Sequence, residues 1–196
     1  MIRIFDILFS TLGLIILSPL FLILAIWIKF NSNGPVFYKQ IRVGKDNKDF
    51  KLIKFRSMVT DADKKGLITV GGHDPRVTQS GYFIRKYKLD ELPQLINVFK
   101  GEMSLVGPRP EVRKYVDMYN EDQRKVLSVK PGITDYASIE YIDENEILGK
   151  AEDPDKIYIK KIFPEKICFN MKYINNKSLI EYFKIILLTI GKIFTK

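Results

Sequence analysis

The chain is poor in the residues that form disulfides and soft-metal sites. It has a single cysteine, Cys168, and a single histidine, His73. One cysteine excludes an intramolecular disulfide, and neither residue type is numerous enough for the Cys/His cluster that structural zinc requires. A catalytic metal would therefore need carboxylate ligands, which favour magnesium or manganese. The composition is that of a reduced, cytosol-facing protein.

Other familiar features are also missing. The sequence has no internal repeat, no low-complexity tract and no glycine-rich phosphate loop, so neither the P-loop nor the dinucleotide-binding fold is predicted. Its 23 acidic residues are outnumbered by 32 lysines and arginines, which leaves a net charge of +9. This surplus indicates an anionic partner: nucleic acid, an anionic membrane face or a phosphorylated substrate. The length of 196 residues suffices for one compact domain with an appendage.

A long apolar run without any charge lies near the start of the chain, from Ile7 to Ile28. As a straight helix it would extend about 33 Å, enough to cross the hydrocarbon core of a membrane. A cleavable signal peptide is a weaker interpretation. The run is long for such a peptide, only Arg3 precedes it as a basic residue, and no small-residue cleavage site follows.

The dipeptide Ser18-Pro19 interrupts this run near its middle. Proline removes a backbone hydrogen bond and clashes with the carbonyl group of Ile15, at a cost of about 3 kcal/mol in a straight helix. We expect a sharp bend there, with the Ser18 hydroxyl as a partner for the freed carbonyl group. The two arms would extend only about 16 and 14 Å. A hairpin that dips into one leaflet therefore competes with a kinked transmembrane helix.

Two neighbouring carboxylates, Asp90 and Glu91, precede a short predicted helix. The helix is indicated by apolar residues at helical spacing and by a closing Gly101: Leu92, Leu95, Ile96 and Phe99. Asp90 falls at or just before the helix N-terminus, where the positive end of the helix dipole favours its ionised form. Such a carboxylate can bind a hard cation or attack phosphorus, although capping the helix is the commoner role of an aspartate there.

A stiff turn, Gly107-Pro108-Arg109-Pro110, follows this helix. The two prolines restrict the backbone on both sides of Arg109. A guanidinium group held by such a turn suits bidentate recognition of a phosphate or a carboxylate. The alternative is a rigid connector with a solvated arginine.

Three segments together resemble the signature of the monotopic phosphoglycosyl transferases, the bacterial sugar transferase family. They are Lys54-Phe55-Arg56-Ser57-Met58, the run from Lys88 to Pro110, and Lys130-Pro131-Gly132-Ile133-Thr134. With the apolar start, the similarity covers residues 1 to about 134 in the order of the family. Such a length of similarity is far more specific than a short consensus pattern.

The resemblance implies an α+β fold. Residues 1–30 would form a re-entrant membrane helix-break-helix, broken at Ser18 and Pro19, and residues 31–196 a small cytosolic α/β catalytic domain with amphipathic interfacial helices. The protein would be monotopic, on the cytoplasmic face of the bacterial inner membrane and in contact with inner-leaflet lipids. A homodimer is left open.

The activity that the resemblance implies is transfer of a sugar phosphate from a UDP-sugar to polyprenyl (undecaprenyl) phosphate, as the first membrane step of glycoconjugate assembly. Asp90 would be the nucleophile that releases UMP and holds a covalent phosphosugar. Glu91 would either place Mg²⁺ together with Asp90 or deprotonate the lipid phosphate. Phosphate contacts would fall to four basic residues: Lys54, Arg56, Arg85 and Arg109.

Two of these basic residues lie on a predicted strand. Short strands are expected at 36–38 and 50–55, around a polar turn at 44–49. Lys54 and Arg56 are two residues apart, so both would project to the same face and reach phosphate oxygens together. A solvated basic edge that discourages strand pairing is the alternative.

The stretch before the carboxylate pair is less informative. Residues 60–79 are polar and predict a loop, in which His73 is a surface residue rather than a catalytic base. A helical turn is expected at 82–87. Within it, Arg85 either pairs with a phosphate or carboxylate or adds plain surface charge.

The second half of the chain mixes expected helices with an unfamiliar segment. One helix is predicted over 111–129, with Val112, Tyr115, Val116 and Tyr119 in the core. Beyond Thr134 the sequence departs from the family pattern, so the donor sugar is undetermined. Residues 178–196 predict an apolar, basic helix that either lies in the membrane interface or packs on the core.

Two other functional classes compete with the transferase. A membrane-anchored nucleic-acid binder is suggested by charge alone, and it predicts a steep salt dependence of binding and no need for Asp90. A catalytically idle scaffold for glycan assembly is the third class. The family resemblance implies no nucleic-acid partner.

Overall fold

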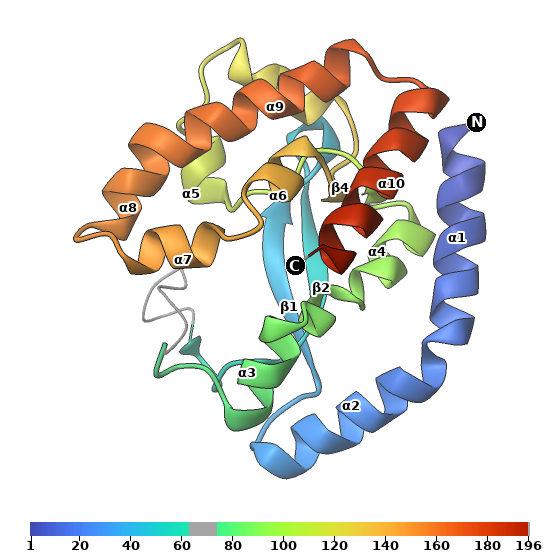
Figure 1. Cartoon of the computed structure of the whole chain (residues 1–196), viewed down its shortest axis with the longest axis vertical. Coiled ribbons are helices and arrows are strands. Elements are labelled where there is room, and N and C mark those ends of the chain that lie inside the picture. The colour runs from blue at the N-terminus through green and yellow to red at the C-terminus, as the bar shows by residue number, and fades with distance from the viewer. Residues whose placement is uncertain (63–73, 196) are drawn as a thin grey trace.

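Helices dominate the computed structural model, which describes residues 1–62 and 74–195 (Figure 1). Two small sheets complete it: an antiparallel hairpin and a pair of short parallel strands. This mixture confirms the α+β class predicted from the sequence. The prediction for His73 lies outside the described residues.

Two apolar helices, α1 (Ile2–Ile16) and α2 (Ser18–Asn31), begin the chain and are bent by 60° relative to each other. The bend lies at the predicted Ser18-Pro19 break. The Ser18 hydroxyl donates to the carbonyl oxygen of Ile15 at 2.8 Å, which confirms the expected partner for that carbonyl group. Among the described helices, none is long and apolar enough to cross a membrane by itself, whereas this bent pair together reaches that length and composition.

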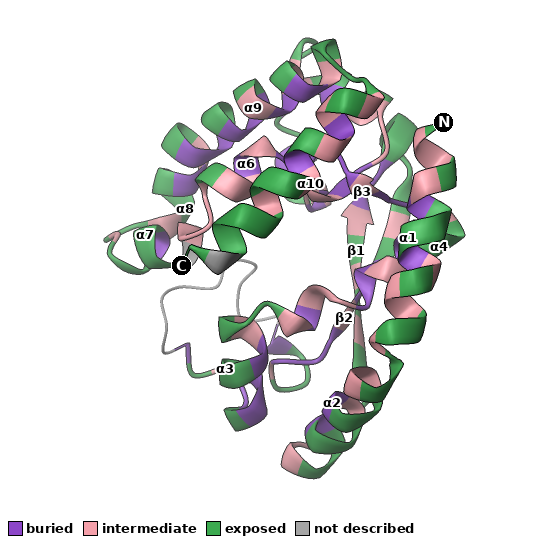
Figure 2. Ribbon diagram, turned by 45° about the vertical axis from the view of Figure 1, so that its right-hand side comes forward, coloured by how far each residue is buried: buried purple, intermediate pink, exposed green. Residues whose placement is uncertain are grey.

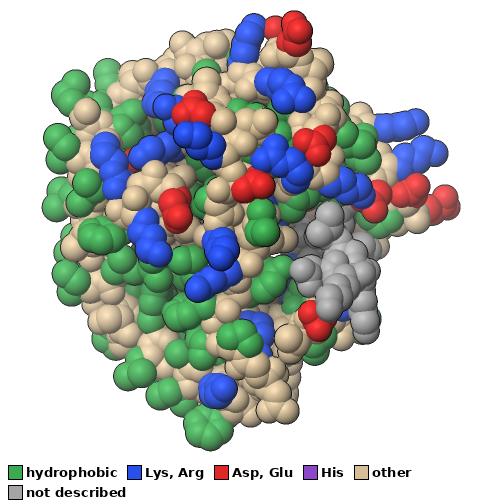
Figure 3. Space-filling view, turned by 180° about the vertical axis from the view of Figure 1, so that it is seen from behind, with side chains coloured by type: hydrophobic (Ala, Val, Ile, Leu, Met, Phe, Trp, Pro, Cys, Tyr) green, Lys and Arg blue, Asp and Glu red, His purple; other side chains and the backbone are tan. Residues whose placement is uncertain are grey.

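The outer side of the bent pair carries large apolar side chains that no part of the described chain covers (Figure 2). Those more than half exposed are Ile4, Leu8, Ile15, Ile16, Leu22, Ile23 and Phe30. Seen from behind, hydrophobic side chains gather along the edge that α1 and α2 occupy, while charged side chains cluster toward the opposite part of the molecule (Figure 3). An apolar surface of this extent marks a membrane or protein interaction site.

A buried carboxylate joins α1 to distant parts of the chain. Asp6, only 2% exposed, accepts hydrogen bonds from the Ser104 hydroxyl at 2.9 Å, the Leu105 amide at 2.9 Å and the Tyr182 hydroxyl at 3.0 Å. Buried polar groups satisfied in this way define one packing arrangement. The apolar helices are therefore held at a set position on the remaining domain.

The antiparallel hairpin consists of β1 (Phe37–Val43) and β2 (Asp49–Phe55). Its register pairs Phe37 with Phe55 at one end and Val43 with Asp49 at the other, around a 3₁₀ turn at Lys45–Asn47. Both predicted strands are confirmed, and the first is longer than predicted. On the second strand, Lys51 is exposed, whereas Lys54 contacts Glu91 of the segment that packs over the strand and is not a solvated edge residue.

Helix α3 (Gln79–Lys86) and helix α4 (Gln94–Lys100) flank the carboxylate pair, which lies in a 3₁₀ turn at Leu89–Glu91. The helix predicted after the pair is confirmed. It ends at Gly101, whose φ of 89° lies in the left-handed region that glycine adopts without strain.

The single helix predicted over 111–129 is wrong. The structure has only a short helix there, α5 (Arg113–Val116), and then a 3₁₀ segment at Gln123–Ser128. Between them, the Asn120 side chain accepts from the Gln123 amide at 2.9 Å, and the Gln123 side chain accepts from the Asn120 amide at 3.0 Å. These local side-chain bonds compete with the helical ones and end the helix. The predicted core residues Val112, Tyr115, Val116 and Tyr119 are nevertheless all buried.

The parallel strands β3 (Ser104–Val106) and β4 (Gly132–Thr134) lie next to the hairpin, and helices follow to the end of the chain. These are α6 (Tyr136–Glu140), α7 (Glu144–Gly149), α8 (Pro154–Ile157), a π-helical turn (Tyr158–Ile162), α9 (Phe163–Asn175) and α10 (Leu179–Phe194). Helix α9 lies at the end of the molecule opposite α2 (Figure 1).

The last helix, α10, has two apolar sides. Tyr182 and Ile185 are fully buried against the domain, whereas Ile180 is 81% and Leu187 68% exposed. The predicted packing on the core is therefore confirmed for one side of the helix. The other side stays available for the predicted membrane interface.

Candidate active site

Glu91 lies between two cations that come from other parts of the chain. Lys54 on β2 donates to its carboxylate at 3.0 Å, and Arg109 binds both carboxylate oxygens, with one contact at 3.0 Å. The side chains of Lys54 and Glu91 are only 16% and 18% exposed. Burial opposes ionisation of Glu91, but Arg109 and Lys54 outweigh it and hold the pKa of Glu91 well below its usual range.

Asp90 has a different environment, although it is the next residue. It is 7% exposed, and within the described chain its carboxylate accepts no hydrogen bond. Burial and the charge of Glu91 raise its pKa, and the more distant Lys54, Arg85 and Arg109 only partly offset this. Neither the 3₁₀ turn nor α4 has a side-chain cap, so Asp90 does not serve as a helix cap.

The pKa values of the two neighbouring carboxylates are thus shifted in opposite directions, down for Glu91 and up for Asp90. Lys54 and Arg109 favour the ionised form of Glu91, whereas Asp90 is buried, accepts no hydrogen bond in the described chain and is costly to ionise. Pairs of titratable groups with divergent pKa values are typical of sites where the two groups have separate chemical roles.

The turn that carries Arg109 is held in place by close backbone packing of Gly107 against Gly132. The Gly107 amide donates to the Thr134 carbonyl at 3.0 Å, and the Gly132 amide donates to the Pro108 carbonyl at 2.9 Å. A Cβ atom on Gly132 would lie 2.1 Å from the Gly107 nitrogen, so only glycine permits this approach. The Lys130–Thr134 segment therefore supports the arginine turn.

The carboxylate of Asp135 completes this support. It accepts from the Arg109 amide at 3.2 Å and from the Ser138 amide at 2.6 Å, where it caps α6. Asp135 was not identified from the sequence, because an aspartate followed by a short helix gives no signal beyond an ordinary cap.

Arg85 and Arg56 have different surroundings. Arg85 lines the same cavity as Asp90 and lowers the pKa of that carboxyl. The guanidinium group of Arg56 donates instead to the carbonyl oxygens of Ser32 at 2.6 Å and Asn33 at 2.5 Å, beyond the end of α2. Lys54 and Arg56 both line the cavity, but their charged groups have different partners, Glu91 for Lys54 and the segment after α2 for Arg56. A joint contact of the two residues with phosphate stays a prediction.

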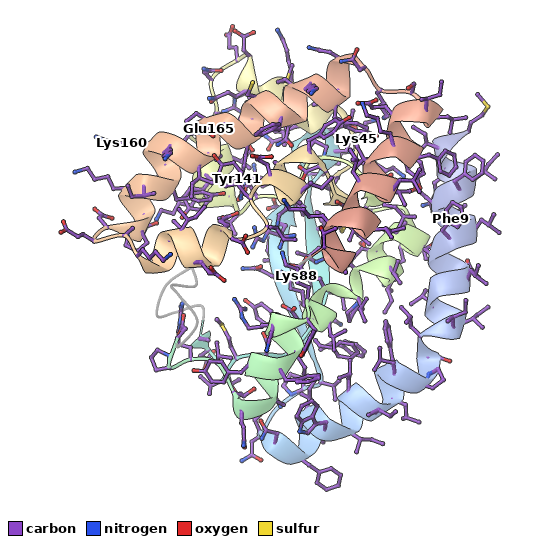
Figure 4. The ribbon with its side chains drawn as sticks, viewed as in Figure 1. Phe9, Lys45, Lys88, Tyr141, Lys160 and Glu165 are labelled. Carbon is purple, nitrogen blue, oxygen red and sulfur yellow. The ribbon has the colours of Figure 1, made fainter. Side chains whose placement is uncertain are left out.

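A cavity of about 480 Å³ connects these groups. One end, near α3, is lined by Arg85, Asp90 and Glu91. Arg109 pairs with Glu91 at this end, and the charge of Glu144 on α7 also acts on it. The other end is formed by α6, α7 and α9, which all follow Thr134. Two residues of the lining, Lys88 and Tyr141, are labelled in Figure 4.

The residues present fit a magnesium ion only if a ligand shares it. Among the described residues, no group of three or more His, Cys, Asp or Glu side chains could hold a metal ion. Magnesium, however, needs only one or two protein carboxylates where substrate phosphates complete its shell. Asp90 offers a carboxylate without other partners, whereas Glu91 would first have to give up contacts with Lys54 or Arg109.

Comparison with known proteins agrees with this geometry. Residues 1–196 match the family described as bacterial sugar transferase. The chain is 40% identical over 193 residues to a UDP-N-acetylgalactosamine-undecaprenyl-phosphate N-acetylgalactosaminephosphotransferase of Aeromonas hydrophila, covering 97% of this chain and 43% of that protein. It is 38% identical over 197 residues to the UDP-glucose:undecaprenyl-phosphate glucose-1-phosphate transferase of Escherichia coli K12, covering 96% and 39%.

A relative of more similar length is the exopolysaccharide production protein ExoY of Sinorhizobium fredii. It is 34% identical over 203 residues, covering 96% of this chain and 83% of the relative. By contrast, the chain spans only about two fifths of the length of the Aeromonas and Escherichia proteins.

Proposed function

The chain belongs to the bacterial sugar transferase family, and we propose that it transfers a sugar phosphate from a UDP-sugar to undecaprenyl phosphate, releasing UMP. The observation that carries the proposal is Asp90: a buried carboxylate with no hydrogen-bond partner in the described chain, beside Glu91 and its two cations. The names of the relatives support the acceptor and the class of donor.

In the proposed reaction, a carboxylate oxygen of Asp90 attacks the β-phosphorus of the donor. The bond from that phosphorus to the bridging oxygen breaks, and UMP leaves with the oxygen and its electron pair. An oxygen of the lipid phosphate then attacks the same phosphorus, breaks its bond to Asp90 and restores the carboxylate. Two displacements replace one difficult step.

The surrounding cations would balance the charge of the donor diphosphate. Lys54 and Arg109 lie partly buried beside Glu91, and Arg85 lines the same end of the cavity. Since Glu91 fixes the orientation of both Lys54 and Arg109, we assign it a positioning role. Charges held in place before the reaction stabilise developing charge without reorganisation.

Magnesium bound at Asp90 would reduce the repulsion between a carboxylate and a diphosphate. We expect Asp90 rather than Glu91 to contact the ion, because the Glu91 oxygens already have cationic partners. The chain's own contribution is to keep the Asp90 carboxylate buried and free of hydrogen bonds from the described residues.

We further propose that α1 and α2 enter and leave the inner leaflet on the cytoplasmic side of the bacterial inner membrane. The exposed apolar side chains of the bent pair support this, as does the Arg56 contact that ties the end of α2 to the strand before the active site. Asp90 and Glu91 would then lie at the depth of the lipid headgroups, where the phosphate of a polyprenyl acceptor is found.

Cysteine labelling in intact cells tests this topology. In a Cys168→Ser background, we expect Ile2→Cys, and the more exposed Ile4→Cys, to react with an impermeant maleimide only after the cells are permeabilised. A transmembrane helix would place these positions outside and make them reactive in intact cells. The exposed Cys168 of the parent protein reports the side on which the catalytic domain lies.

UMP release from the purified protein in detergent, with undecaprenyl phosphate and magnesium, tests the function itself. We expect sustained release over many turnovers to require both the lipid phosphate and a particular UDP-sugar, because the first displacement alone releases no more than one UMP per protein molecule. A nucleic-acid binder would instead show salt-sensitive binding to DNA or RNA without UMP release. A scaffold would show neither, and either result would contradict the proposal.

A further inference from the structure

The part of the cavity beyond Arg109 contains polar groups that the proposed chemistry does not use. We call it the distal chamber; it is lined by Ser138, Tyr141, Glu144, Lys166 and Asn170. These side chains come from α6, α7, α9 and the connection between α6 and α7, all after Thr134.

Asn170 is the most unusual of these residues. It is 6% exposed, and its Oδ1 atom is buried without any hydrogen-bond partner. The Ser138 hydroxyl is also buried and lies beside the carboxylate of Asp135. An unsatisfied buried polar atom loses its hydrogen bonds to water without replacement, so native proteins rarely keep one without a role.

The charges in the distal chamber are already balanced. Lys166, 8% exposed, pairs with Glu144 at 2.6 Å, and the charge of Glu144 also acts on Arg109. Asp135 is occupied by two backbone amides. The chamber therefore suits an uncharged polar group, in contrast to the end of the cavity that carries Lys54, Arg85 and Arg109.

The position and the lining of the chamber suit a water-soluble group better than the lipid tail. Its main wall, α9, lies at the opposite end of the molecule from α2, and only the last turns of α9 come near the start of α1 (Figure 1). The polar side chains Ser138, Lys166 and Asn170 line it, so we assign it to a polar part of the donor.

We infer that the distal chamber binds the sugar ring of the donor and that Asn170, with Ser138, hydrogen-bonds its hydroxyl or acetamido groups. This rests on the proposed function. An amide both donates and accepts, as a sugar hydroxyl does, which allows it to distinguish donors that differ in one substituent.

The test compares Asn170→Ala with the parent protein on UDP-glucose, UDP-galactose and their N-acetylated counterparts. For the donor that the parent prefers, we expect kcat/KM to fall about tenfold and the preference over the other donors to shrink similarly. The inhibition constant of UMP should be the same for Asn170→Ala and the parent protein. The melting temperature should not fall, because the amide has no partner to lose.

Asn175→Ala is the matched control, an exposed asparagine on the same helix that does not line the cavity. It should behave like the parent protein. An Asn170→Ala variant with unchanged preference, or with weaker UMP inhibition, would overturn the sugar assignment, the latter in favour of the nucleoside.

Equilibrium binding of each UDP-sugar and of UMP gives the same comparison without turnover. If the parent protein binds UDP-sugars but forms no lipid product, the proposed function fails while the chamber assignment is still decided by Asn170→Ala. If the parent protein binds no UDP-sugar, the chamber assignment fails as well.

Discussion

Asp90→Asn is expected to lower turnover by at least about 10⁴-fold, as loss of a covalent nucleophile does in other enzymes. The amide keeps the shape of the side chain but cannot attack phosphorus. The fold should be preserved, because Asp90 accepts no hydrogen bond in the described chain. UMP release and mass spectrometry of the protein, incubated with donor but without lipid, are the measurements.

The same variant should be as stable as the parent protein or more so. Burial and Glu91 raise the pKa of Asp90, so its ionised form costs stability in the folded state above that pKa. Asparagine removes this cost at neutral pH. The resulting gain in the free energy of unfolding should vanish in acid, where Asp90 is protonated in both the folded and the unfolded protein. For the parent protein, kcat/KM should fall as the pH decreases through the raised pKa.

The exposed Asp117→Asn serves as the matched control, and it should gain the mass of a phosphosugar like the parent protein. Product formation without any added mass on Asp90 would refute the covalent mechanism. Turnover by Asp90→Asn close to that of the parent protein would remove this residue from the reaction.

Glu91→Gln is expected to reduce both activity and stability. Its carboxylate pairs with Lys54 and Arg109, and a neutral amide would leave both cations without compensation in a buried site. We expect a loss of about 2–3 kcal/mol in the free energy of unfolding, below the range for fully buried pairs because these side chains are partly exposed. Turnover should fall about 10²- to 10³-fold, since the cations lose their orientation.

The pH dependence separates this variant from Asp90→Asn. The folded-state pKa of Glu91 is depressed, so its ion pairs contribute stability above its unfolded pKa, and this contribution is lost as the pH falls through the lower folded pKa. The loss in the free energy of unfolding caused by Glu91→Gln should therefore be largest at neutral pH and become smaller in acid. Urea unfolding at several pH values measures it, with the exposed Glu121→Gln as control.

A positioning residue and a general base give different results in the two half-reactions. If Glu91 positions Lys54 and Arg109, the Gln variant should be slow in forming the phosphosugar intermediate as well as in transferring it to lipid. Normal stability with a defect confined to the lipid step would contradict the positioning role and favour deprotonation of the lipid phosphate.

Local features were accessible from the sequence because each depends on a few neighbouring residues. Pro19 removes a hydrogen bond within its own helix, which places the bend between α1 and α2. Gly101 ends α4 because its own backbone conformation is left-handed. The adjacency of Asp90 and Glu91 is likewise a property of the chain itself.

Only the tertiary structure could decide what each of these residues contacts. Glu91 meets Lys54 and Arg109 across 37 and 18 residues, while Arg56, two residues after Lys54, binds the segment after α2 instead. These pairings, and the burial that separates the pKa values of Asp90 and Glu91, arise where distant elements pack together. Residue type and spacing do not predict this packing, because the burial and the partners of a side chain depend on which distant elements fold against it.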